Sequence, residues 1–92
     1  MKKRLEATII GRVQVVMYRD FAMRNAEKLC ITGYVKNEKD GSVRVVAEGE
    51  EQVLEKYLGL LRRGSLLAHV EDVHASWGEA SGEYKNFSIC YR

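Results

Sequence analysis

Hydrophobic and polar residues follow regular patterns along most of the 92-residue chain. Five segments alternate between the two kinds, as half-buried strands do. Two others place apolar residues on one stripe at helical spacing. Strands are therefore predicted at about residues 5–11, 31–37, 43–47, 70–77 and 87–91, and helices at about 18–29 and 50–63.

The boundaries of these elements carry their own signals. Asp40-Gly41 supplies the turn residues for a hairpin between the second and third strands. The second helix has acidic residues first and Arg62-Arg63 last, as the helix dipole prefers. The fourth strand keeps its alternation only if one residue is skipped between Val70 and Val73, which predicts a β-bulge there.

The order of the elements predicts the fold class. It is β-α-β-β-α-β with a short strand at the end, and neither a linker nor a low-complexity stretch interrupts it. Right-handed crossovers place both helices on one face of a mainly antiparallel sheet. We expect one α+β domain over residues 1–92 with a ferredoxin-like sandwich architecture.

Composition narrows the possible partners. Fifteen Lys and Arg residues against thirteen Asp and Glu residues leave a charge of +2, too small to predict nucleic-acid binding. No apolar run approaches the roughly 18 residues of a membrane helix. The two cysteines are far apart and no secretory signal precedes them, so we expect a reduced, cytoplasmic and monomeric protein.

The loop Val13–Tyr18 and the residue that follows it are the first candidate site. Gln14 is its only polar side chain apart from the Tyr18 hydroxyl, so the loop is either buried or offers mainly backbone N–H groups, which can form an anion nest. Arg19 follows at the start of a helix, where the dipole already disfavours a cation. A bound anion removes that conflict, although a solvated arginine is the simpler alternative.

Asn37, at the end of the second strand, is the second candidate. Beside a hairpin, asparagine is commonly a turn or capping residue. A functional role requires Arg19 nearby, which β-α-β geometry allows because the first loop and the end of the second strand approach each other across the helix.

Other chemistries find little support in the sequence. His69 and His74 are on the order of 16 Å apart in an extended strand, too far to share a metal ion. A sheet that binds RNA needs exposed aromatic residues on its central strands, and the segment 44–48 has none. Neither candidate motif contains a residue placed as a base or nucleophile. Hydrolysis of an acyl phosphate fits, because its carboxylate leaves without an acid catalyst and needs only positioning and charge stabilisation.

Several ordered motifs make the chain resemble the acylphosphatase family over nearly its whole length. They are Gly11–Gln14 with Val16 and Arg19, Gly33–Asn37, Asp40-Gly41, Ala47–Gly49, and Gly82, Tyr84 and Phe87. The resemblance implies a metal-free hydrolase of carboxyl-phosphate bonds without a cofactor, acting on a small acyl phosphate and releasing inorganic phosphate, which also inhibits. It implies catalytic roles for Arg19, which holds the phosphate, and Asn37, which orients water. The implied phosphate-binding residues are Val13, Gln14, Val15, Val16, Met17, Tyr18 and Arg19.

Two departures from the family pattern matter most, beside milder ones at Tyr18, Tyr34 and Ser65. Val15 replaces a glycine, and a valine at positive φ would be strained unless the loop relaxes and leaves it at negative φ. A non-catalytic or impaired anion-binding domain on the same fold is therefore the alternative function. Cys30 stands where a glycine usually ends the first helix, at an expected cost of about 1 kcal/mol if left-handed geometry is kept.

Overall fold

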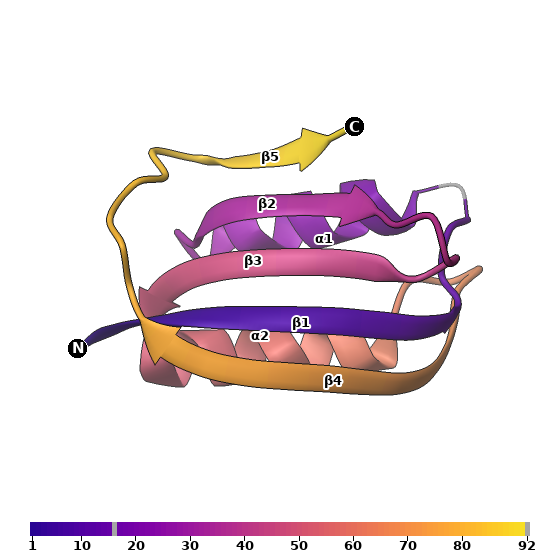
Figure 1. Cartoon of the computed structure of the whole chain (residues 1–92), viewed down its shortest axis with the longest axis horizontal. Helices are drawn as coiled ribbons and strands as arrows, with labels where there is room; N and C mark the ends of the chain where they lie inside the picture. The colour runs from indigo at the N-terminus through magenta and orange to yellow at the C-terminus, as the bar shows by residue number, and fades with distance from the viewer. Residues whose placement is uncertain (16, 92) are drawn as a thin grey trace.

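A five-stranded sheet carries both helices on one of its faces (Figure 1). The computed structural model describes residues 1–15 and 17–91. The elements are β1 (Lys2–Arg12), α1 (Tyr18–Lys28), β2 (Thr32–Asn37), β3 (Val43–Glu50), α2 (Glu51–Arg63), β4 (His69–Glu79) and β5 (Phe87–Cys90). Their order confirms the predicted α+β ferredoxin-like fold with an additional C-terminal strand.

The strands lie in the order β4-β1-β3-β2-β5. All neighbours are antiparallel except β5, which runs parallel to β2. The alternation within each strand sends one set of side chains under the helices and the other to the uncovered face. Leu5, Ala7 and Ile9 of β1 lie on the covered face and are at most 1 % exposed, so this face forms the core.

Two tyrosines join the helices above the core. The Tyr57 hydroxyl of α2 donates a hydrogen bond to the Ala22 carbonyl of α1 at 2.8 Å. The Tyr18 hydroxyl of α1 donates one to the Leu61 carbonyl of α2 at 3.0 Å. Burial raises the pKa of both phenols, so each remains a protonated donor. Because Tyr18 is the first residue of α1, this bond also fixes the start of the helix.

The predicted bulge in β4 is present. Ile10 pairs with Asp72 whereas Gly11 pairs with Val70, so Glu71 is the extra residue. Gly11 has a φ of 135°, and a Cβ built on it would lie only 2.2 Å from the His69 carbonyl oxygen. Glycine is therefore required where β1 turns toward the following loop.

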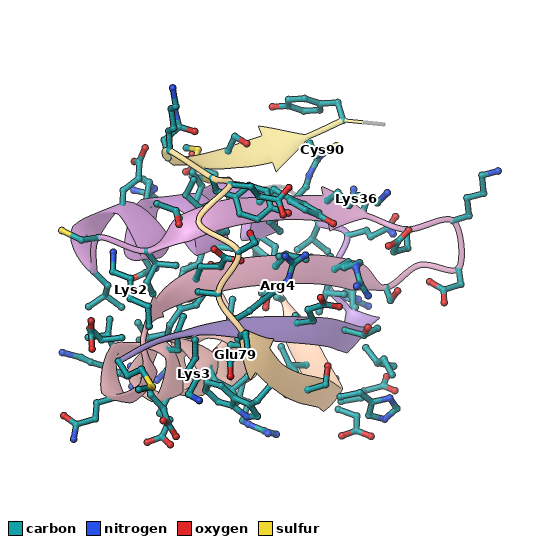
Figure 2. All side chains as sticks on the ribbon, turned by 60° about the vertical axis from the view of Figure 1, so that its left-hand side comes forward. Lys2, Lys3, Arg4, Lys36, Glu79 and Cys90 are labelled. Atoms are coloured by element: carbon teal, nitrogen blue, oxygen red, sulfur yellow. The ribbon has the colours of Figure 1, made fainter. Side chains whose placement is uncertain are left out.

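The segment between β4 and β5 crosses the uncovered face of the sheet, in front of Arg4 in Figure 2. Glu48, which is 4 % exposed, holds this segment by accepting hydrogen bonds from the Ser81 N–H, the Ser81 hydroxyl and the Gly82 N–H at 2.9–3.0 Å. Burial opposes ionisation of Glu48, but these hydrogen bonds and Arg4 keep its pKa below the usual range. The crossing carries the chain to the far edge of the sheet, where β5 joins β2.

Neither of the two helices in the described part of the chain has the length and apolar run needed to cross a membrane.

Candidate active site

The segments that carry the candidate residues lie together at one end of the strands. Strands β1 and β2 both run antiparallel to β3, which lies between them, so the C-terminal ends of β1 and β2 are on the same side of the sheet. The β1–α1 loop and the β2–β3 hairpin meet there, on the right-hand side of Figure 1. Strand β5 also ends there because it is parallel to β2. Topology thus brings the loop before Arg19 and the strand end at Asn37 to one place, as the sequence predicted.

Gln14 joins the loop to the hairpin directly. Its side-chain nitrogen donates hydrogen bonds to the carbonyl oxygens of Glu38 at 2.6 Å and Ser42 at 2.8 Å. Gln14 was predicted to line the phosphate cradle, but its side chain is occupied by the hairpin. It can serve an anion only through its backbone N–H, and its amide fixes the loop relative to Asn37.

The other side chains of the predicted cradle point mostly away from solvent. Val13 and Tyr18 are buried and Val15 packs partly against the core, whereas Met17 is 56 % exposed. The predicted cradle residue Val16 lies outside the described residues. The Tyr18 N–H donates to the Val15 carbonyl at 3.3 Å, a long hydrogen bond that closes a turn. Apart from Met17 and the hydrogen-bonded Gln14, the described side chains of the loop are thus turned inward, which is compatible with a nest of backbone N–H groups.

Of the two conformations considered for Val15, the strained one at positive φ is not present. Of the described non-glycine residues, only Met17 and Cys30 have positive φ, at 78° and 58°. The left-handed residue in this loop is therefore Met17, immediately before α1. An unbranched side chain tolerates that conformation better than valine would. The structure thus agrees with the relaxed loop, in which Val15 keeps negative φ.

Arg19 lies in the first turn of α1, and its guanidinium carbon is 4.9 Å from the centre of the Tyr91 ring. Within residues 1–15 and 17–91, no carboxylate lies within 4.0 Å of this guanidinium. The neighbouring Asp20, which could repel a bound anion, is paired with Arg24 at 2.8 Å. The positive charge of Arg19 is therefore available to a ligand at the start of the helix.

Asn37 is the last residue of β2 and pairs with Val43 across the hairpin. Its carbonyl oxygen Oδ1 is buried and has no hydrogen-bond partner among the described residues. Leaving such an acceptor unpaired costs about 1–3 kcal/mol, which marks the position as unusual. The hairpin turn is instead stabilised by Asp40, which accepts hydrogen bonds from the Ser42 N–H and hydroxyl at 2.9 and 2.6 Å. The simpler role of Asn37 as a turn residue is thus filled by another side chain.

Comparison with known proteins identifies the family. The sequence profile of the family described as Acylphosphatase matches residues 5–89. The chain belongs to the acylphosphatase family. An acylphosphatase of Thermus thermophilus is 49 % identical over 94 % of this chain and 97 % of its own length, and one of Salinibacter ruber is 42 % identical over 96 % and 93 %. The crystal structure of acylphosphatase from Bacillus subtilis superposes with a TM-score of 0.93 at 32 % identity, covering 97 % of this chain and 99 % of that one.

Sequence reasoning about this acylphosphatase missed Tyr91. The residue was assigned to the last strand, but β5 ends at Cys90 and Tyr91 follows it over Arg19. No local motif connects the two positions, because 71 residues separate them and only the parallel pairing of β5 with β2 brings them together. To predict this contact, one would need to know that β5 pairs with β2 and in which register.

Proposed function

We propose that this acylphosphatase hydrolyses the carboxyl-phosphate bond of small acyl phosphates to a carboxylate and inorganic phosphate, without a metal ion or cofactor. The proposal is supported chiefly by the position of Arg19. Its guanidinium, which has no carboxylate partner among residues 1–15 and 17–91, stands in the first turn of α1, directly after the loop. A cation, a helix N-terminus and a backbone nest together favour a phosphate group.

In the proposed mechanism Arg19 and N–H groups of the loop 13–18 hold the phosphate oxygens, with the Tyr18 N–H exchanging its long turn hydrogen bond for one to the ligand. Their positive charge offsets the charge that accumulates on these oxygens as water attacks phosphorus. The guanidinium can offer two parallel N–H bonds, which fix the orientation of the phosphate as well as its charge.

Asn37 orients the attacking water in this proposal. Its unpaired Oδ1 can accept a hydrogen bond from water, and that bond would remove the cost of leaving the acceptor buried and alone. The water oxygen forms a bond to phosphorus while the bond between phosphorus and the acyl oxygen breaks. The leaving carboxylate takes the electron pair, and the proton from water passes to phosphate or solvent. Because the conjugate acid of the leaving group has a pKa of about 4, departure needs no acid.

Inorganic phosphate is the expected inhibitor as well as a product, because it presents the same anion to the loop. The proposal includes a monomeric state and a cytoplasmic location. Support for the location comes from Cys30 and Cys90, which are both free thiols, as expected in a reducing compartment. Size-exclusion chromatography of the reduced protein tests the oligomeric state.

The alternative of an impaired anion-binding domain rested on strain at Val15. That strain is absent, since Val15 does not have positive φ. No other feature of the described residues favours binding without hydrolysis.

Hydrolysis of benzoyl phosphate with and without a chelator tests the proposed function. We expect metal-independent turnover that inorganic phosphate inhibits competitively, and its loss in Arg19→Ala. Lys28→Ala, which removes an exposed cation from the other end of the same helix, is the matched control and should keep wild-type turnover. Absence of turnover in the wild-type protein would overturn the proposal.

A further inference from the structure

A cavity of about 320 Å³ lies directly beside the proposed phosphate loop. Met17, Phe21 and Arg24 of the first turns of α1 form one wall, and the segment 64–67 between α2 and β4 forms the other. Positions 17, 21 and 24 fall on one stripe of the helix, so this wall follows the helix away from the loop. The volume is at the lower end of the range of about 300–1,000 Å³ found for small-molecule sites.

The cavity has large apolar side chains at its mouth. Leu66 is 98 % exposed, Leu67 is 62 % exposed and Met17 is 56 % exposed. These three belong to the small set of large hydrophobic side chains that are exposed in the described structure. Apolar surface of this kind gains free energy when a ligand removes it from water. Methionine also adapts readily to ligands of different shape.

The charge of the cavity is neutralised from within α1. Among the described lining residues Arg24 alone is charged, and its guanidinium is paired with the Asp20 carboxylate at 2.8 Å. A negatively charged group entering the cavity would therefore find no uncompensated cation there. An uncharged, apolar group would lose little hydration free energy on moving from water into the cavity.

Met17 connects this cavity to the phosphate loop. It belongs to the loop and is the N-cap of α1, and it also lines the cavity. The acyl carbon of an acyl phosphate is two bonds from phosphorus. For a substrate held by its phosphate at the start of α1, Met17 is the side chain past which the acyl group reaches the cavity.

We propose that this cavity is the acyl subsite and that the protein selects acyl phosphates with an uncharged, apolar aryl or alkyl acyl group. This inference rests on the proposed function. The loop and Arg19 bind the part that all acyl phosphates share, and residues 64–67 together with Phe21 distinguish among acyl groups. Selection acts through the apolar contacts, because the same phosphate contacts are made by every substrate.

The experiment compares kcat/KM for benzoyl phosphate and acetyl phosphate in the wild-type protein, Leu66→Ser and Leu67→Ser. We expect the wild-type protein to prefer benzoyl phosphate by about tenfold or more, and each variant to lose a large part of that preference through KM. The kcat/KM for acetyl phosphate, whose methyl group buries little surface, should fall much less than that for benzoyl phosphate, and inhibition by inorganic phosphate, which has no acyl group, should stay unchanged. Both leucines are exposed, so the variants should retain the wild-type melting temperature.

Trp77→Ser is the matched control. Trp77 is also a large, partly exposed hydrophobic residue, but it lies near Lys3 and Glu51, outside the cavity. It should leave the substrate ratio unchanged. Leu67→Lys provides a test of opposite sign, because a new cation should raise kcat/KM for an acyl phosphate that carries a second carboxylate, such as succinyl phosphate.

The outcomes separate this inference from the function on which it rests. Hydrolysis of both substrates, with the same ratio in the wild-type protein and in both leucine variants, would overturn the acyl subsite and leave the proposed activity standing. Hydrolysis of neither substrate by the wild-type protein would overturn both.

Discussion

The Tyr91 ring lies over the guanidinium of Arg19, with 4.9 Å between the guanidinium carbon and the ring centre. Arg19 belongs to the first turn of α1 and Tyr91 follows directly after β5. The parallel pairing of β5 with β2 carries the ring to this position. The cation–π contact restricts the arginine side chain without neutralising its charge, because an aromatic ring carries no net charge.

Tyr91→Ala should therefore weaken inhibition by inorganic phosphate and lower kcat/KM by about two- to fivefold, the size of an exposed cation–π contact. Tyr91→Phe keeps the ring and should behave like the wild-type protein. The ring is 78 % exposed, so the melting temperature should not change. Equal phosphate inhibition constants in all three proteins would show that Tyr91 does not position Arg19.

Arg19→Ala should abolish hydrolysis, with a loss of about a hundredfold or more, because it removes the only cation proposed to contact the phosphate. Arg19→Lys should rescue poorly, since an ammonium cannot offer two parallel N–H bonds. The fold should be retained, since the side chain is not part of the core. Circular dichroism and benzoyl phosphate turnover measure the two effects. Turnover near the wild-type rate in Arg19→Ala would remove this residue from the mechanism.

Asn37→Ala should lower kcat more than it weakens phosphate inhibition, because orienting water matters in the transition state and little in the ground state. The variant should be at least as stable as the wild-type protein despite the partly buried position, since the lost Oδ1 has no hydrogen-bond partner among the residues that the structure describes. Steady-state kinetics and thermal unfolding test the two statements. A parallel loss of phosphate inhibition would mean that Asn37 supports the cradle or binds phosphate itself.

Val15→Gly should bring no gain. Val15 packs against the core at negative φ, so glycine loses apolar contacts and adds unfolded-state entropy of up to about 1 kcal/mol. We expect a lower melting temperature and no increase in turnover. A rise in either would indicate that the valine distorts the loop after all.

Cys30→Gly should stabilise the protein. Cys30 ends α1 at a φ of 58° in a Schellman motif, in which the Ile31 N–H bonds to the Ala26 carbonyl at 2.9 Å and the Cys30 N–H to the Glu27 carbonyl at 3.1 Å. Glycine removes the left-handed strain, and the exposed thiol contributes little packing. The net gain should reach up to about 1 kcal/mol, and about 4–8 °C in melting temperature for each kcal/mol. Cys30→Ala, which keeps the strain, is the control and should show no such gain.

The sequence predicted the features that depend on local pattern. The bulge at Glu71 follows from the interrupted alternation of β4, and the hairpin follows from Asp40-Gly41. The left-handed geometry at Cys30, the position where the family pattern has a glycine, is also present. Each of these is determined within a few residues of chain.

The conformation of the phosphate loop could not be predicted in the same way. Its shape depends on Gln14 reaching the carbonyls of the β2–β3 hairpin and on Tyr18 reaching the Leu61 carbonyl of α2. Both are long-range contacts, and they move the positive φ from the expected Val15 to Met17. The exposure of Trp77 could not be predicted from local pattern either. Its place in the alternation of β4 puts it on the covered face of the sheet, but it lies near the end of an outer strand and remains 43 % exposed.

The place of β1 between β4 and β3 also determines when the protein can become active during synthesis on the ribosome. Strand β1 is made first, but both of its neighbours come later, and β4 begins only at His69. At about 5–20 residues per second, its apolar residues wait several seconds for a partner, exposed to aggregation and to chaperones. Pairing strands so distant in sequence is also slow once the chain is complete. Because Tyr91 reaches Arg19 only after β5, the last strand, has paired with β2, the recovery of hydrolysis after refolding should be among the last signals to appear.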